Sequence, residues 1–412
     1  MTKMVQSAQQ AVEVINSGHS VWVHSMAATP TLLIDALAKH SLAHTDITVI
    51  QMHLENAEAL AAPSLFGHLR NRTFFAGPST RDLINSGDAD YVPIFLSEIP
   101  KLFRSGRQKI DVALIQVSPP DDHGHCSLGI SVDVTRAACE VADIIVAHIN
   151  PNMPRTHGDS PIPLSSIDIA FEQAAPLCYH QPPASDAIQT KIGENVASLI
   201  RNGDCLQVGI GAIPDAVLNA LNNHQNLGIH TEMFSDGVID LVESGVITNS
   251  NKKTYPGKTV TGFVIGSQRL YDFVNDNTLV KFLDIEYVNN IATIRKNPQM
   301  VSINSAIQID YTGQVCADSI GSQIYSGVGG QLDFVLGAQL SRGGRSIIAL
   351  PSTAKGGTVS RIVPELDPGS GVVTTRAHVD YVVTEHGIAA LRGKSLLERR
   401  DALLAISSPD LR

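Results

Sequence analysis

The chain has 412 residues, of which 43% are hydrophobic and 17% are charged, and its formal net charge is −10 at pH 7. These values are typical of a folded globular protein long enough for two or three domains. The acidic balance argues against a nucleic-acid-binding surface, which needs a basic stripe. It does not exclude a phosphate-bearing ligand, because backbone N–H groups and a few lysines can bind one.

The sequence has no segment typical of secretion or membrane insertion. Residues 1–18 are polar and patterned like an amphipathic helix, without the apolar core of a signal peptide. No uninterrupted apolar run approaches the roughly 18 residues that a membrane span needs. The five cysteines form no CxxC pair and are odd in number, which is typical of free, buried thiols. We therefore expect a cytoplasmic protein without a membrane partner.

The first half of the chain alternates short apolar runs with helical patterns. Strands are expected at residues 19–24, 46–52, 73–75, 92–95, 110–117 and 142–149, and a proline-bearing loop is expected at 150–163. This alternation predicts parallel strand pairing with helices on both faces of the sheet.

A short proline-bearing linker, residues 181–186, marks the expected domain boundary. It divides the chain into a first predicted domain at residues 1–180 and a second at residues 187–412. The second begins with a helical pattern at 188–202. Further strands are expected at residues 206–210, 227–229, 259–265, 301–309, 346–350 and 381–384. The expected fold class is α/β, with two open domains built on mainly parallel sheets.

The stretch from residue 206 to residue 237 carries the most information. An apolar run enters a glycine turn at residues 209–214, and Ile213, Val217 and Leu221 then repeat on one helical face. A second short apolar run is followed by Glu232. Because the carboxyl ends of parallel strands form the ligand crevice of an open sheet, Glu232 should face the same crevice as the glycine turn.

Two interpretations of this unit remain open at this point. A glycine turn before a helix presents unpaired N–H groups, which can bind a phosphate or a developing oxyanion. The spacing is G-x-G-x-x-P, and Glu232 follows Gly211 by about 20 residues, as an acid that binds ribose in a dinucleotide site would. A dinucleotide-binding dehydrogenase is therefore one alternative, and a plain structural turn is another.

Three later turns favour a different ligand. They are the glycine-rich residues 326–331, the turn at 354–357 that carries Lys355, and residues 384–387 at the end of the last expected strand. A single dinucleotide fingerprint explains none of them.

The motifs and their order in the chain resemble those of a known protein family. The strings are GIGAIPDAV (209–217), HTEMFSDG (230–237), SINSAIQIDYTGQV (302–315), SGVGGQLDF (326–334), PSTAKGGTVSRIVP (351–364) and DYVVTEHGIAALRGKSL (380–396). With them the chain resembles the acetyl-CoA hydrolase/transferase family, and within it the 4-hydroxybutyrate and butyryl-CoA:acetate CoA-transferases. The resemblance implies an active site in the cleft between the two domains and, by analogy, a homodimer.

The resemblance also implies a mechanism. Glu232 matches the family nucleophile, whose carboxylate attacks an acyl-CoA and forms a glutamyl-CoA thioester. Coenzyme A is then a co-substrate, the second substrate is a short carboxylic acid such as acetate, and no permanently bound cofactor or metal is expected. The residues implied to bind CoA are Gly209, Ile210, Gly211, Ala212, Ile213, Ile307, Gly329 and Lys355.

Other polar residues have open roles. Asn304 and Gln308 could donate hydrogen bonds near Glu232 or could be structural amides. His24, His53 and Glu55 follow first-domain strands, where an acyl group could bind, but structural roles are the favoured interpretation for them. His123 and His125 flank Gly124 without a third ligand at a suitable spacing, so they do not predict a metal site.

The function expected from the sequence is CoA transfer between a short-chain acyl group and acetate. The nearest alternative is a hydrolase, in which water intercepts the acyl-enzyme. The alternative from another class is a non-catalytic CoA-binding regulator, for which Glu232 would be dispensable.

Overall fold

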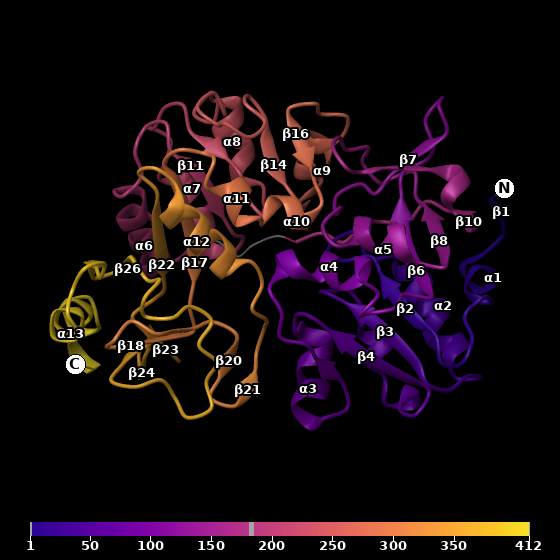
Figure 1. Ribbon diagram of the computed structural model, residues 1–412, viewed down its shortest axis with the longest axis horizontal. Helices are drawn as coiled ribbons and strands as arrows, with labels where there is room; N and C mark the ends of the chain where they lie inside the picture. Colours follow the sequence, from indigo (N-terminus) through magenta and orange to yellow (C-terminus); the bar gives the residue numbers. More distant parts are fainter. Residues whose placement is uncertain (1, 181–184, 412) are drawn as a thin grey trace. The chain divides into compact units, whose positions relative to one another are not determined.

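The computed structural model describes residues 2–180 and 185–411. Most of the expected linker, residues 181–184, lies outside the described residues. The chain divides into two compact units (Figure 1). The first unit holds Met1–His180 and Gly262–Tyr287, and the second holds Gln181–Thr261 and Val288–Arg412.

Residues 262–287 group with the first unit, although the sequence analysis assigns them to the second predicted domain. Backbone hydrogen bonds account for this: Val132 N donates to Gly262 O at 3.0 Å, and Phe282 N donates to His157 O at 2.8 Å. The chain therefore leaves the second unit after Thr261 and re-enters it at Val288. The predicted domain ranges omit this excursion.

The first unit is built on an eight-stranded sheet in the order β1-β10-β8-β6-β2-β3-β4-β5, and neighbouring strands pair in parallel. The strands are β1 (Lys3–Met4), β2 (Ser20–Val23), β3 (Ile47–Gln51), β4 (Leu69–Thr73), β5 (Asp90–Tyr91), β6 (Val112–Val117), β8 (Ile144–Ile149) and β10 (Ile169–Glu172). The helices are α1 (Ala8–Val12), α2 (Thr31–Ser41), α3 (Pro78–Ser86), α4 (Ile99–Arg104), α5 (Thr135–Val141) and α9 (Gln268–Val274). Short strands β7 (His125–Ser127), β9 (Pro161–Pro163), β15 (Phe263–Val264) and β16 (Val280–Phe282) complete the unit.

Alternate side chains of the central strand β2 face opposite sides of this sheet. Val21 and Val23 belong to the apolar cluster that contains the buried residues of α1 and α2. Trp22 points the other way, with its ring 5.3 Å from that of Phe103 in α4, and its Nε1 donates to Thr135 Oγ1 of α5 at 3.3 Å. Helices thus cover both faces (Figure 1), as the continuous apolar runs of buried parallel strands require.

The second unit is built on a six-stranded sheet in the order β12-β11-β17-β22-β26-β27. Its first five strands pair in parallel, and β27 is antiparallel to β26. These strands are β11 (Cys205–Val208), β12 (Gly228–Ile229), β17 (Met300–Ser305), β22 (Arg345–Ala349), β26 (Tyr381–Thr384) and β27 (Gly387–Ala390). The expected α/β class with two mainly parallel sheets is therefore confirmed.

Six helices lie within the described part of the second unit: α6 (Ala187–Ala197), α7 (Ala212–Asn219), α8 (Gly237–Glu243), α11 (Ile291–Ile294), α12 (Gln331–Leu340) and α13 (Leu396–Ala405). A seventh, α10 (Ile285–Val288), spans the point where the chain passes from one unit to the other. The smaller strands are β13 (Met233–Phe234), β14 (Thr259–Thr261), β18 (Gln308–Asp310), β19 (Val315–Cys316), β20 (Ser319–Ile320), β21 (Gln323–Ile324), β23 (Thr353–Ala354), β24 (Val359–Ser360) and β25 (Ile362–Val363).

Four strand predictions fail. The run at 259–265 divides into β14 and β15, which join different two-stranded sheets. The expected strand at residues 92–95 is wrong, because Pro93 has no N–H to donate and the strand β5 ends before it. The expected strand at 73–75 lies earlier, at β4. The run at 301–309 forms two strands, since the chain leaves the six-stranded sheet after β17 and enters a three-stranded sheet at β18.

The helix expected over residues 1–18 is much shorter than predicted. Only α1 forms, and Ser7 begins it by accepting a hydrogen bond from Gln10 N. No helix within residues 2–180 or 185–411 is long and apolar enough to cross a membrane.

Candidate active site

The glycine turn of the second unit joins β11 to α7. Gly209, Ile210 and Gly211 are half-buried, and Gly211 precedes the first residue of the helix. The backbone of Gly211 has a φ of 108°, a conformation that residues with a Cβ rarely adopt. The tight turn therefore depends on glycine at this position and presents the amino end of α7 beside the end of β11.

Glu232 follows β12, the strand next to β11. Thr231 fixes its position, because the Thr231 hydroxyl donates to Val208 O at 2.9 Å and accepts from Val208 N at 3.3 Å. Val208 is the last residue of β11 and directly precedes the glycine turn. Glu232 and the turn consequently follow the carboxyl ends of adjacent parallel strands, as the sequence predicts.

Two groups from distant parts of the chain meet the Glu232 carboxylate. Asn289 Nδ2 donates to Glu232 Oε2 at 2.9 Å. Gly330 lies so close that a Cβ at this position would be 2.1 Å from Glu232 Oε2 and 2.1 Å from Asn289 Nδ2. Any side chain at residue 330 would therefore displace the carboxylate or its amide partner.

The residues that precede Glu232 in the chain belong to a buried polar cluster. His230 is fully buried, its Nε2 lies 2.8 Å from Val288 O, and burial, reinforced by the Lys252 charge, lowers the pKa of His230 to about 3. Lys252 Nζ donates to Ile229 O and to Lys258 O, both at 2.5 Å, and burial lowers the pKa of Lys252 to about 8. Because a carbonyl only accepts, the neutral His230 carries its proton on Nε2.

The remaining residues predicted to bind CoA are distributed over the second unit. Ala212 and Ile213 open α7 and are half-buried. Gly329 directly precedes Gly330 and has a φ of 57°. Lys355 is exposed in the turn that joins the antiparallel strands β23 and β24, and Ile307 lies between β17 and β18.

Asn304 and Gln308 have partners other than Glu232. Asn304 Nδ2 donates to Gln207 Oε1 at 3.1 Å, and Gln308 Oε1 accepts from Asp367 N at 3.0 Å. These contacts support structural roles for both amides.

The first-unit candidates do not form a single cluster by their hydrogen bonds. His24 Nε2 contacts Ser131 O at 2.6 Å, and burial lowers its pKa. His53 and Glu55 pair with each other, with 3.0 Å between Nε2 and Oε1, and the hydrogen bond from His53 lowers the pKa of Glu55. Within the described residues, no group of three or more His, Cys, Asp or Glu side chains could hold a metal ion.

Sequence reasoning missed two residues that touch the Glu232 carboxylate. Gly330 lies in the glycine-rich string at residues 326–334, next to Gly329, which the resemblance implies as a CoA-binding residue; the string alone does not show which glycine approaches Glu232. Asn289 had no signal of its own, since it stands 57 residues from Glu232 in a stretch without a motif.

Two protein-family models match most of the chain. Residues 1–177 match the acetyl-CoA hydrolase/transferase N-terminal domain, and residues 266–412 match the C-terminal domain of the same family. The chain belongs to the acetyl-CoA hydrolase/transferase family. The resemblance inferred from the sequence is confirmed.

Two relatives whose names state a CoA-transferase activity are similar over the whole chain. A 4-hydroxybutyrate coenzyme A transferase from Clostridium kluyveri is 49% identical, covering 100% of this chain and 95% of the relative. A butyryl-CoA:acetate CoA-transferase from Anaerostipes caccae is 36% identical, with coverages of 100% and 94%.

Solved structures of family members have the same fold. A 4-hydroxybutyrate CoA-transferase from Porphyromonas gingivalis is 39% identical with a TM-score of 0.86, covering 99% of this chain and 95% of that one. RipA from Yersinia pestis is 34% identical with a TM-score of 0.94, with coverages of 99% and 94%.

Proposed function

We propose that this protein transfers CoA between a short-chain acyl-CoA, such as 4-hydroxybutyryl-CoA or butyryl-CoA, and acetate, with Glu232 as the nucleophile. The observation that carries the proposal is the Glu232 carboxylate at the carboxyl end of β12, hydrogen-bonded by Asn289 and closely approached by Gly330. The activities named for the relatives from Clostridium kluyveri and Anaerostipes caccae support the choice of substrates.

The first half of the reaction forms a covalent enzyme. A Glu232 oxygen attacks the acyl carbonyl, the C–S bond breaks, and an acyl-glutamyl anhydride and the CoA thiolate result. The thiolate then attacks the glutamyl carbonyl, which releases the acyl group as its carboxylate and leaves a glutamyl-CoA thioester. The second half runs these steps in reverse with the acceptor acid, so that one difficult exchange is divided into easier ones.

The surroundings of Glu232 suit this chemistry. The Asn289 amide orients the carboxylate, and the N–H groups of the turns at Gly209 and Gly330 are the type of donor that stabilises a developing oxyanion. Half-burial of Glu232 reduces its contact with water, which raises the reactivity of a weak nucleophile. Gly209, Ile210, Gly211, Ala212, Ile213, Ile307, Gly329 and Lys355 are proposed to bind CoA, with Lys355 pairing with a phosphate.

Trapping the thioester tests the nucleophile. After incubation with acyl-CoA, borohydride reduces a glutamyl thioester to the alcohol, and mass spectrometry should find this change at Glu232. Glu232→Gln should lower kcat by roughly 10³-fold or more and remove the modification. Glu194→Gln, at an exposed carboxylate of α6, is the matched control and should retain both. Modification of another carboxylate would show that the nucleophile has been assigned incorrectly.

The acceptor separates transfer from hydrolysis. We expect CoA exchange to require acetate or a similar acid, with little free CoA formed in its absence. Acetyl-CoA hydrolases from Kluyveromyces lactis and Neurospora crassa are 25% and 26% identical to this chain, so water is the competing acceptor. CoA release at an equal rate with and without an acid would favour the hydrolase.

A further inference from the structure

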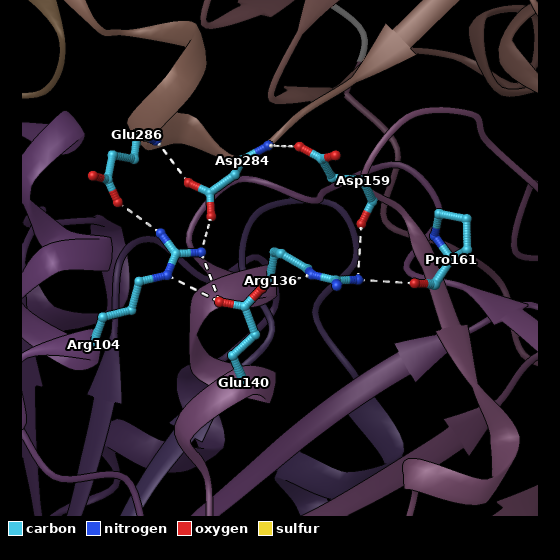
Figure 2. Close-up of polar contacts among 7 residues, drawn as sticks. All are labelled: Arg104, Arg136, Glu140, Asp159, Pro161, Asp284 and Glu286. Atoms are coloured by element: carbon cyan, nitrogen blue, oxygen red, sulfur yellow. Dashed lines mark hydrogen bonds and ion pairs between the residues drawn. The ribbon is translucent and has the colours of Figure 1, made fainter.

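Arg104, at the end of α4, contacts three carboxylates in the first unit (Figure 2). Its Nε and Nη2 donate to Glu140 Oε2 at 2.9 and 2.8 Å. Its Nη1 donates to Glu286 Oε2 at 2.7 Å, and its Nη2 also donates to Asp284. One guanidinium thus joins α5 to a segment about 180 residues after Arg104 in the chain.

The two later carboxylates belong to the start of α10. Asp284 Oδ1 accepts from Glu286 N at 2.8 Å, and Asp284 N donates to Asp159 Oδ2 at 3.0 Å (Figure 2). A helix of four residues has too few internal hydrogen bonds to hold its own geometry. Arg104 and Asp159 therefore fix where α10 begins and how it is oriented.

The last residue of α10 and the residue after it contact the segment that carries the proposed nucleophile. Val288, the last residue of α10, presents its carbonyl to His230 Nε2. Asn289, three residues after Glu286, donates to the Glu232 carboxylate. Both Val288 and Asn289 are fully buried, and Asn289 Oδ1 has no hydrogen-bond partner among the described residues. The amide is consequently held by the path of its backbone and by the Glu232 contact.

A second crossing of the chain also ends at Glu232. Thr261 Oγ1 donates to Glu232 O at 3.2 Å, and the next residue, Gly262, accepts from Asp133 N at 3.3 Å. Asp133 O in turn accepts from Ile285 N at 3.1 Å. The backbone of Asp133 therefore contacts the chain near both crossings, and Thr261, the last residue before the chain leaves the second unit, contacts the backbone of Glu232.

We propose that Arg104 is a positioning residue for CoA transfer: it holds Asp284 and Glu286, fixes α10, and so sets the Asn289 amide against the Glu232 carboxylate. This inference rests on the proposed role of Glu232. The alternative is an ion-pair cluster that only stabilises the first unit. Arg104 is 32% exposed, but its partner Asp284 is buried, so removal of Arg104 lowers stability in either role, whereas only the positioning role also lowers kcat. The two roles therefore predict different measurements.

A double-mutant cycle between Arg104 and Asn289 is the test. Arg104→Gln should lower kcat and the rate of thioester formation roughly tenfold, because a small displacement of a catalytic contact is costly. The KM for acyl-CoA should change less than about twofold, since no CoA-binding residue moves. In an Asn289→Ala background, Arg104→Gln should have no further effect on kcat, because the group through which it acts has been removed.

Two further variants sharpen the cycle. Arg104→Lys retains the charge but not the planar fork, and should restore only part of kcat. Arg70→Gln removes the exposed Arg70–Asp90 pair of the same unit and should leave kcat unchanged. If Arg104→Gln does not fold, Glu286→Gln removes one contact of Arg104 and should show the same dependence on Asn289 with a smaller loss.

The outcomes separate this inference from the proposed function. If Arg104→Gln lowers kcat equally with and without the Asn289 side chain, the positioning role is overturned. It is also overturned if Arg104→Gln changes thermal stability but leaves kcat unchanged. Failure to find the borohydride modification at Glu232 in the unaltered protein would instead overturn the proposed nucleophile. If the Arg104→Gln protein forms the thioester slowly but still at Glu232, the result supports both the positioning role and the proposed nucleophile.

Discussion

Both units have mainly parallel sheets, but the residues at the carboxyl ends of their strands differ. At the carboxyl ends of β2, β6 and β8 in the first unit, buried polar side chains satisfy one another. Gln116 Nε2 donates to Ala28 O and Thr29 O at 3.1 and 3.2 Å, and Gln116 Oε1 accepts from Asn150 Nδ2 at 2.6 Å. His24 Nδ1 accepts from Gln116 N at 3.2 Å. This network is closed and typical of a structural role.

In the second unit the corresponding strand ends carry glycine turns and a carboxylate. The turn after β11 is half-buried, and Glu232 after β12 meets an amide and a glycine from distant segments. This difference supports the proposed location of the reacting group in the second unit, while the hydrogen-bonded strand ends of the first unit suit a structural role.

The largest effect is expected from adding a methyl group at Gly330. Gly330→Ala should lower kcat roughly 100-fold, because the new Cβ would displace the Glu232 carboxylate or the Asn289 amide. Steady-state kinetics with a short acyl-CoA would measure this. Gly245→Ala is the matched control: Gly245 has a φ of 77° and open space around it, so the change should cost about 1 kcal/mol of stability and leave kcat intact. A fully active Gly330→Ala protein would contradict the geometry at Glu232.

A change at the strand ends of the first unit should affect stability instead of catalysis. Gln116→Leu removes the acceptor of Asn150 Nδ2 and the donor to two buried carbonyl groups. It should lower the free energy of unfolding by about 2 kcal/mol, measured by urea denaturation, with kcat within twofold of the parent. A tenfold loss of kcat in protein of unchanged stability would mean that these strand ends contribute to acyl binding.

The smallest effect is expected at the exposed Lys355. Lys355→Ala should raise the KM for acyl-CoA by roughly fivefold and leave kcat unchanged, because a single solvated charge contributes about 1 kcal/mol to phosphate binding. The increase in KM should shrink at high salt. Lys191→Ala, at another exposed lysine of the second unit, is the control and should leave KM unaltered. An unchanged KM for Lys355→Ala would remove Lys355 from the proposed CoA site.

Local patterns predicted most of the sheet strands and the surroundings of the glycine turn. The run at residues 110–117 became β6, and the four-residue spacing of Ile213 and Val217 became α7. Prediction failed where one residue or a change of sheet interrupted an apolar run. Pro93 excluded a strand at 92–95, and residues 301–309 divide between two sheets. An apolar run indicates burial but does not show which sheet a strand joins.

The candidate site likewise has a part that the sequence predicts and a part that depends on tertiary packing. Glu232 and the turn at Gly209 were predicted to share one crevice because each comes shortly after a strand, and parallel strands bring such positions to one edge of a sheet. Asn304 lies near the end of β17 and Gln308 begins β18, yet their side chains pair with Gln207 and Asp367 N. Position at a strand end therefore identifies the neighbourhood of a site, whereas the direction of each side chain depends on the packing around it.

The sequence by itself determined the α/β class, the family, the glycine turn and the carboxylate, because each is encoded by residues close together in the chain. Only the tertiary structure decided which groups touch that carboxylate. Asn289 lies 57 residues from Glu232, and Arg104 lies 180 residues from Asp284. Such contacts arise from the return of residues 262–287 to the first unit. No local pattern records that excursion, since it follows from the combined packing of segments far apart in the chain.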